Sequence, residues 1–226
     1  MAMYWMIIIV LTLLSVIVSS RLTSKFKEYS KIKLQGNLTG KDIAEMMLKN
    51  HNIIDVSVQC TEGHLTDHYN PTDKVINLSK EVYYGNHIAA AAVAAHETGH
   101  AIQHAEAYSW LQLRTSLVPI VHFSSKWVMW VLIAGILLVN TFPSLLLIGI
   151  ILFGATTLFS FVTLPVEINA SNRAINWLDN VVSYEQLPKA KHALKLAAYT
   201  YVVAALSSLA TLLHYVMIFL GSSNDD

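Results

Sequence analysis

The sequence predicts a mainly α-helical membrane protein with about four transmembrane helices and a polar region that contains a small β-hairpin. Apolar residues make up 54% of the 226 residues and charged residues only 13%, whereas charged residues make up roughly 25% of a typical soluble domain. The apolar residues are clustered in runs close to the roughly 20 residues that a helix needs to cross the hydrocarbon core. Two polar segments separate these runs, so membrane and aqueous parts of the chain alternate.

The first apolar run covers residues 3–18 and is followed by Ser19, Ser20 and Arg21. We interpret residues 1–20 as an N-terminal transmembrane anchor that is slightly shorter than a typical span. A cleaved signal peptide is the alternative. Such a peptide begins with a basic region, however, and no charged residue precedes this run.

Residues 21–115 form the first polar segment. The stretch 42–49 (DIAEMMLK) has the pattern of a short amphipathic helix that begins near Thr39 or Gly40. Residues 53–59 (IIDVSVQ) and 74–78 (KVINL) carry β-branched residues, and the turn-forming stretch between them predicts a hairpin with a long loop. From about residue 86 to 107 the chain is rich in alanine, which predicts a helix.

The next apolar stretch is too long for one span and predicts a transmembrane hairpin within residues 116–164. The turn-forming sequence NTFPS at 140–144 divides it into arms at about 118–139 and 145–163. Residues 165–195 form a second polar segment. Residues 196–220 then form a fourth span, and the acidic tail 221–226 (GSSNDD) follows it.

Basic residues indicate how these spans are oriented. They follow the first span and lie between the third and the fourth, whereas the hairpin tip and both ends of the chain have none. The positive-inside rule therefore predicts that 21–115 and 165–195 lie together in the cytoplasm, with both termini outside. The basic residues concerned are Arg21, Lys25, Lys27, Lys31, Lys33, Arg173, Lys189, Lys191 and Lys195.

Charge balance and cysteine content exclude several classes of protein. The chain has 15 basic and 15 acidic residues, and no cluster of basic and aromatic residues predicts binding to nucleic acid. Cys60 is the only cysteine. An intramolecular disulfide and a zinc cluster of several thiolates are therefore excluded.

The predicted helix 86–107 contains the pentapeptide HETGH, with His96, Glu97, Gly99 and His100. Residues four apart on a helix share a face, so both imidazoles can point at one ion about 2 Å away, the usual zinc–nitrogen distance. Glu97 lies roughly 100° around the helix, where it can reach a water at the metal and act as a general base. Gly99 would leave room for the backbone of a substrate. The alternative is a helix that carries histidines without binding a metal.

A catalytic zinc needs a third protein ligand. His104 shares a face with the other two histidines, but it lies two turns from His96 and is too far along the axis to bind the same ion easily. The metzincin pattern would have a glycine at position 103 and a histidine at position 106. This chain has Gln103 and Glu106 there, which excludes that class.

Glu167, in the stretch LPVEINASNRA at 164–174, is the better third ligand. Pro165 suits the first turn of a new helix that leaves the third span. Glu167 would then lie at the cytoplasmic membrane surface, on the same side as the helix with the two histidines. A carboxylate at the end of an apolar run needs a partner, and a metal ion is one. Hydrogen bonds from backbone N–H groups at a helix start are the alternative.

These motifs together resemble the YugP-like neutral zinc metallopeptidases, a family of bacterial membrane proteases. The resemblance covers nearly the whole chain, because LTDHYNPTDKVINLS, HETGHAIQH and LPVEINASNRA occur in order together with four apolar spans. It implies a zincin-like catalytic region of the gluzincin type in a protein of the bacterial inner membrane. The orientation predicted from the basic residues puts this region at the cytoplasmic face. The resemblance also implies one Zn²⁺ per chain, bound by His96, His100 and Glu167, with Glu97 as the general base.

The activity that this resemblance implies is zinc-dependent endopeptidase cleavage of membrane-associated proteins or peptides near the membrane surface. The family pattern has Asp where this chain has Asn169, and a neutral amide holds a metal ligand less strongly than a carboxylate does. The exposed edge of strand 53–59 or 74–78 is a candidate to pair with an extended substrate. Candidates for stabilising the oxyanion or orienting the ligands are His68, Tyr69, Asn169, Ser171, Arg173, His192 and Tyr201.

Two other functions compete with this one. A divalent-metal transporter would also place histidines and a glutamate in a helical membrane protein. The predicted helix around His96 carries many polar residues, however, and follows a long polar segment, so it is expected beside the bilayer rather than across it. A non-catalytic membrane scaffold would contain no stoichiometric zinc.

Overall fold

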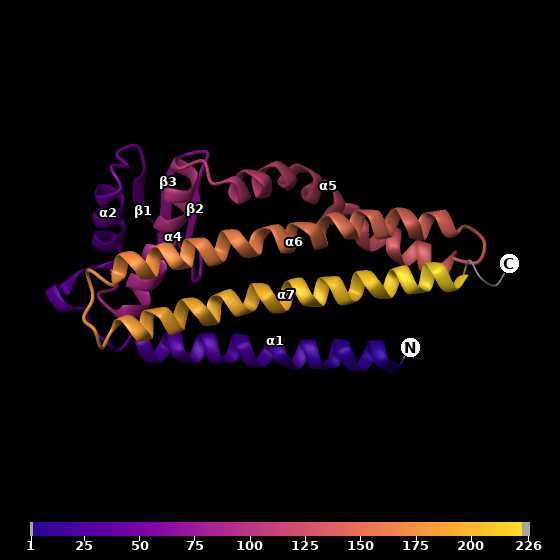
Figure 1. Ribbon diagram of the computed structural model, residues 1–226, viewed down its shortest axis with the longest axis horizontal. Coiled ribbons are helices and arrows are strands. Elements are labelled where there is room, and N and C mark those ends of the chain that lie inside the picture. The colour runs from indigo at the N-terminus through magenta and orange to yellow at the C-terminus, as the bar shows by residue number, and fades with distance from the viewer. Residues whose placement is uncertain (1, 223–226) are drawn as a thin grey trace. The chain divides into compact units, whose positions relative to one another are not determined.

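The computed structural model describes residues 2–222, so the last four residues of the predicted tail lie outside the described residues. The chain divides into two compact units. The first comprises Met1–Ile17, Gln112–Leu164 and Thr200–Asp226, and the second comprises Val18–Leu111 and Pro165–Tyr199. Four long helices contribute to both units (Figure 1): α1 (Ala2–Tyr29), α5 (Ser109–Leu137), α6 (Pro143–Leu178) and α7 (Leu187–Ser222).

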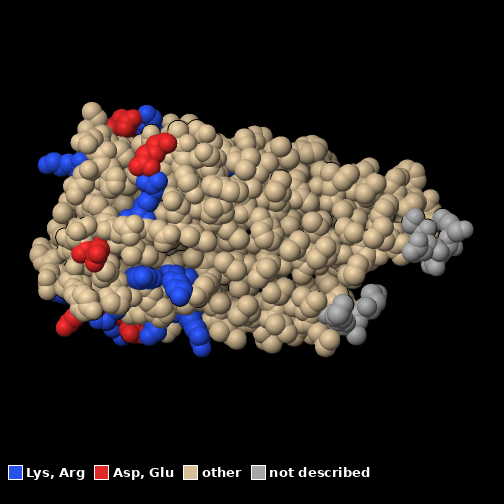
Figure 2. Space-filling model, viewed as in Figure 1, with Lys and Arg blue, Asp and Glu red and all other residues tan. Residues whose placement is uncertain are grey.

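Each of these four helices is long and apolar enough to cross a membrane, which confirms the predicted class of mainly α-helical membrane protein. The first unit, which holds most of their apolar residues, carries only Arg114 and Lys126 as charged residues within its described part. On the face seen in Figure 2, charged side chains gather over the second unit. This separation is expected when one unit is surrounded by lipid and the other by water.

The predicted transmembrane hairpin is formed by α5 and α6, which pack closely because small residues line their contact. A Cβ atom on Gly135 would lie 2.6 Å from the Cα atom of Leu146, so only glycine fits there. In the same unit, the hydroxyls of Thr157 on α6 and Ser208 on α7 are 2.7 Å apart and form a hydrogen bond. Small residues and hydrogen bonds of this kind hold helices together where the surrounding lipid provides no hydrophobic driving force.

The second unit surrounds helix α4 (Ile88–Ala105) with α2 (Gly40–Asn50), α3 (Lys80–Tyr83) and a small sheet. The short 3-10 helix η1 (Gln35–Asn37) precedes α2. As predicted, α2 begins after Thr39, whose hydroxyl accepts from the backbone N–H of Asp42, while Asp42 accepts from the backbone N–H of Thr39. Such a capping box satisfies N–H groups that have no partner within the helix.

The sheet has the order β1–β3–β2, with strands β1 (Ser57–Thr61), β2 (His68–Asn70) and β3 (Val75–Ser79). The prediction that the first and last of these strands form a hairpin is wrong, because β1 pairs with β3 in parallel. A hairpin does occur, but between β2 and β3. The turn-forming stretch between the predicted strands contains β2, and this third strand gives the chain the reversal that a parallel pair requires.

The prediction that Pro165 begins a new helix is also wrong. Helix α6 runs without interruption from Pro143 to Leu178, with Pro165 inside it (Figure 1). Proline is tolerated inside long membrane helices because neighbouring groups can satisfy the freed backbone carbonyl. The predicted segment 165–195 comprises the end of α6, a short connection, and the start of α7.

Candidate metal centre

Helix α4 presents the HETGH pentapeptide from the core of the second unit. The helix begins at the N-cap residue His87, whose Nδ1 accepts a hydrogen bond of 3.1 Å from the backbone N–H of Ala90. Its alanines at 89–92, 94 and 95 are fully buried. Because their side chains are short, neighbouring elements can approach the helix closely from several sides, which fixes the direction of the polar side chains that follow.

Helix α6 approaches α4 closely at Gly99. A Cβ atom on this glycine would lie 2.6 Å from the backbone oxygen of Ala170. The expectation that Gly99 leaves room for a substrate is therefore wrong, because α6 fills that room. The close approach has another consequence: Glu167, one turn before Ala170 on α6, is brought to the face of α4 that carries His96 and His100.

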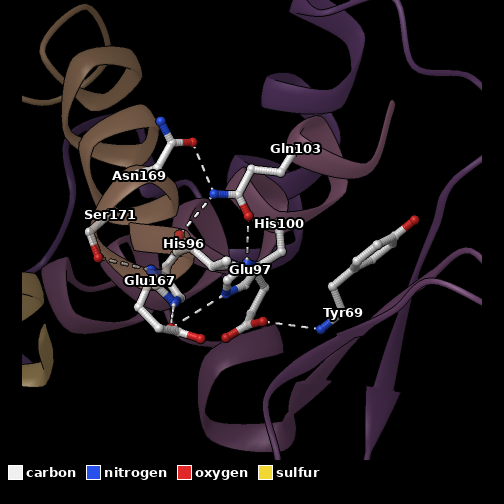
Figure 3. A network of polar contacts seen from close by, with 9 residues as sticks. Tyr69, His96, Glu97, His100, Gln103, Glu167, Asn169 and Ser171 are labelled. Atoms are coloured by element: carbon white, nitrogen blue, oxygen red, sulfur yellow. Dashed lines mark hydrogen bonds and ion pairs between the residues drawn. The ribbon is translucent and has the colours of Figure 1, made fainter. Parts of the chain in front are cut away.

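The side chains of His96, His100 and Glu167 converge as the sequence predicts (Figure 3). Oε2 of Glu167 lies 3.3 Å from Nε2 of His96 and 3.6 Å from Nε2 of His100. In a tetrahedral site with zinc–ligand bonds of about 2.0–2.2 Å, neighbouring ligand atoms lie roughly 3.3–3.6 Å apart. The three side chains are 14%, 11% and 4% exposed. Two imidazoles and one carboxylate in this arrangement fit a zinc ion.

The other ring nitrogen of each histidine has a hydrogen-bond partner. Nδ1 of His96 lies 3.1 Å from the hydroxyl of Ser171, and Nδ1 of His100 lies 3.0 Å from Oε1 of Gln103. Both Nε2 atoms therefore face Glu167 and are left for a metal. Metal-binding histidines are commonly held in this way through the nitrogen that does not bind the ion.

Glu97 is buried beside this group but is not one of the three converging side chains. Its Oε2 accepts a hydrogen bond of 3.0 Å from the backbone N–H of Tyr69 on β2. The ring of Tyr69 points away from Glu97 in Figure 3, and its hydroxyl lies 2.8 Å from Nδ1 of His104. Strand β2 thus fixes the direction of a carboxylate that is available for proton transfer.

The pKa of His100 is raised above its ordinary value. Burial by itself lowers this pKa, but the hydrogen bond to Glu167 and the negative charges of Glu97 and Glu167 outweigh burial. A histidine must lose its proton to bind a metal. Zinc therefore competes with a proton at His100, and its affinity is expected to fall as the pH decreases.

The remaining predicted residues lie in several places. Asn169 and Arg173 are hydrogen-bonded to each other, and Arg173 also forms an ion pair with Glu106. Two other candidates have hydrogen-bond partners outside the group of three converging side chains. Nδ1 of His68 lies 2.7 Å from the backbone oxygen of Thr66, and Nδ1 of His192 lies 2.7 Å from the hydroxyl of Tyr29. Tyr201 belongs to the first unit.

The sequence-based prediction missed Gln103, because one glutamine in a helix has no distinctive pattern.

Replacement of Gly99 by alanine is expected to lower the free energy of unfolding by roughly 1–3 kcal/mol, the usual cost of overpacking a core. The added methyl group would meet the backbone of α6 and push Glu167 away from the histidines. We therefore expect a lower melting temperature and a lower zinc content in the purified protein. Gly154→Ala is the matched control, since within residues 2–222 no atom beyond the neighbouring turns of its own helix backbone lies within 4 Å of its added Cβ. Equal melting temperatures for the two variants would contradict the close approach.

Comparison with known proteins identifies the family of this chain. The profile of the family described as "Putative neutral zinc metallopeptidase" matches residues 4–220. A curated relative from Bacillus subtilis (strain 168), named "Putative membrane protease YugP", is 41% identical over 208 residues, which cover 91% of this chain and 92% of the relative. No solved structure matches the chain significantly. The profile and the relative both span nearly the whole sequence, so the chain belongs to the neutral zinc metallopeptidase family that includes this relative.

Proposed function

We propose that this membrane protein is a zinc-dependent endopeptidase that hydrolyses peptide bonds near the membrane surface. Its substrates are proteins or peptides, in particular membrane-associated ones. The convergence of His96, His100 and Glu167 at the distances expected around a zinc ion is the observation that carries the proposal. Membership in a peptidase family supports an enzyme over a metal transporter or a scaffold.

His96, His100 and Glu167 would hold one zinc ion per chain in a site of the gluzincin type. Zinc bound there supplies a Lewis acid that polarises the scissile carbonyl and makes water a stronger acid. Glu97 takes a proton from the attacking water and passes it to the nitrogen of the leaving amine. The hydrogen bond from the backbone N–H of Tyr69 holds one oxygen of Glu97, which leaves the other for this proton transfer.

Metal analysis combined with a protease assay tests this proposal. Protein purified in detergent is expected to contain one zinc ion per chain and to hydrolyse casein. A strong chelator should abolish the hydrolysis, and added zinc should restore it. Purified protein without zinc, or hydrolysis that persists after the metal is removed, would reject the proposal. Zinc uptake into liposomes without proteolysis would instead support a transporter.

We further propose that the catalytic segments lie in the cytoplasm and that both termini lie on the other side of the bacterial inner membrane. Cys60 allows a direct test, because it is the only cysteine and is exposed on β1. A membrane-impermeant maleimide is expected to label Cys60 only after the membrane of spheroplasts is broken.

The matched control places a cysteine at the tip of the helical hairpin, as Ser144→Cys in a Cys60→Ser background. This residue is the last of the predicted turn 140–144 and lies at the start of α6. It is expected to react in intact spheroplasts. Labelling of Cys60 in intact spheroplasts would reverse the proposed orientation.

A further inference from the structure

Gln103 forms hydrogen bonds to both helices of the candidate metal centre, α4 and α6, and is fully buried. It lies on α4, one turn after His100, and its Oε1 is 3.0 Å from Nδ1 of that histidine. Its Nε2 lies 2.8 Å from the backbone oxygen of Val166 on α6. The same atom lies 2.9 Å from Oδ1 of Asn169, also on α6 (Figure 3). Both polar atoms of the Gln103 side-chain amide therefore form hydrogen bonds within the site.

The orientation of this amide is determined by its surroundings. A backbone carbonyl can only accept a hydrogen bond, so the atom of Gln103 that faces Val166 must be the NH₂ group. Arg173 can only donate, and its Nε lies 2.8 Å from Asn169. The atom of Asn169 between Arg173 and Gln103 is therefore its oxygen, which again requires the NH₂ group of Gln103. The oxygen of Gln103 is left facing His100.

This orientation selects one tautomer of His100. Because the amide oxygen of Gln103 can only accept, Nδ1 of His100 must carry the proton. In the neutral ring, Nε2 is then the nitrogen with a free electron pair, and Nε2 is the atom 3.6 Å from Oε2 of Glu167. Ser171 cannot do the same for His96, since a hydroxyl can donate or accept.

We propose that Gln103 is a positioning residue that holds His100 in the tautomer required for zinc binding and ties it to the helix that carries Glu167. The second role follows from its bond to Val166, the residue directly before Glu167. The inference rests on the proposed function, because it assumes that His100 and Glu167 bind the metal. Partners of this kind typically contribute a factor of roughly 10–100 to metal affinity.

Gln103→Met tests the proposal, because methionine has a similar length but makes no amide hydrogen bonds. The zinc affinity of the purified protein, measured by competition with a coloured chelator, is expected to fall roughly 10–100-fold. The matched control is Gln186→Met. Gln186 is another buried glutamine of the second unit, and its amide donates to the backbone oxygen of Lys33. This control is expected to bind zinc with wild-type affinity.

A spectroscopic measurement separates positioning from packing. In metal-free protein with ¹⁵N-labelled histidine at alkaline pH, the ¹⁵N shifts of His100 are expected to report a protonated Nδ1. Gln103→Met should shift the ring towards the other tautomer, whereas Gln186→Met should not. The resonances of His100 are assigned by their absence in a His100→Ala variant.

Two results would overturn the proposal: unchanged zinc affinity in Gln103→Met, or a loss of affinity without any change of tautomer. The second result would mean that Gln103 acts through packing alone. A wild-type protein that binds no zinc would instead reject the proposed function. The tautomer measurement would then still decide whether Gln103 orients His100.

Discussion

A Glu97→Gln variant is expected to hydrolyse casein more slowly by a factor of roughly 100 to 10,000 while it still binds one zinc ion per chain. The substitution keeps the size of the side chain and removes its ability to take up a proton. The amide oxygen of glutamine can still accept the hydrogen bond from the backbone N–H of Tyr69, so the packing around the site should persist. Zinc should remain because Glu97 is not among the three converging side chains.

Glu45→Gln is the matched control for this experiment. Glu45 is an exposed carboxylate on α2 in the same unit, where it pairs with Lys41 at 3.6 Å. The control removes one negative charge from the same unit but should hydrolyse casein at the wild-type rate. Wild-type hydrolysis by Glu97→Gln would exclude Glu97 as the general base. Loss of zinc together with activity would show that Glu97 supports the metal site instead of the proton transfer.

Several helices and the convergence of distant residues can be predicted from the sequence. The alanine-rich pattern predicts α4, and the spacing of His96 and His100 places both on one face. The positive-inside rule predicts that the two polar segments lie on one side of the membrane, and Glu167 is therefore expected near the histidines. The structure brings these three side chains together, while their roles as metal ligands stay predictions that the variants test.

Other features could not be predicted because they depend on the tertiary structure. The parallel pairing of β1 with β3 has no pattern of its own, since strand propensity does not specify direction. Pro165 would end most helices, but α6 continues through it, as membrane helices can when other groups satisfy the backbone. Gly99 contacts a helix that lies about 70 positions later in the sequence, and the role of Gln103 appears only once α6 is in place.

Glu167→Ala is expected to weaken zinc binding strongly. The loss should exceed the roughly 10–100-fold that is typical when a residue that only hydrogen-bonds to a metal ligand is replaced. The substitution removes one of three candidate ligands and leaves two histidines on a single turn of α4. Loss of casein hydrolysis should accompany the loss of zinc. Glu185→Ala, which removes an exposed carboxylate from the connection between α6 and α7, is the control and should retain both.

Glu167 could be a zinc ligand or could have only a structural role, and these alternatives predict different melting temperatures. Measuring the stability of the protein with and without zinc distinguishes between them. A ligand that binds only the folded protein at 100 times its dissociation constant stabilises it by about 2.7 kcal/mol. Each kcal/mol corresponds to about 2–4 °C for a protein of this size. Zinc should therefore raise the melting temperature of the wild type and of Glu185→Ala by several degrees.

The same rise should be absent in Glu167→Ala if Glu167 is a zinc ligand. If Glu167 serves only as an ion-pair partner of His96 and His100, its removal should lower the melting temperature of the metal-free protein instead. In that case zinc would have little effect on either protein. The difference between the two melting temperatures of each variant, rather than either value alone, therefore decides whether the carboxylate of α6 and the imidazoles of α4 share one metal ion.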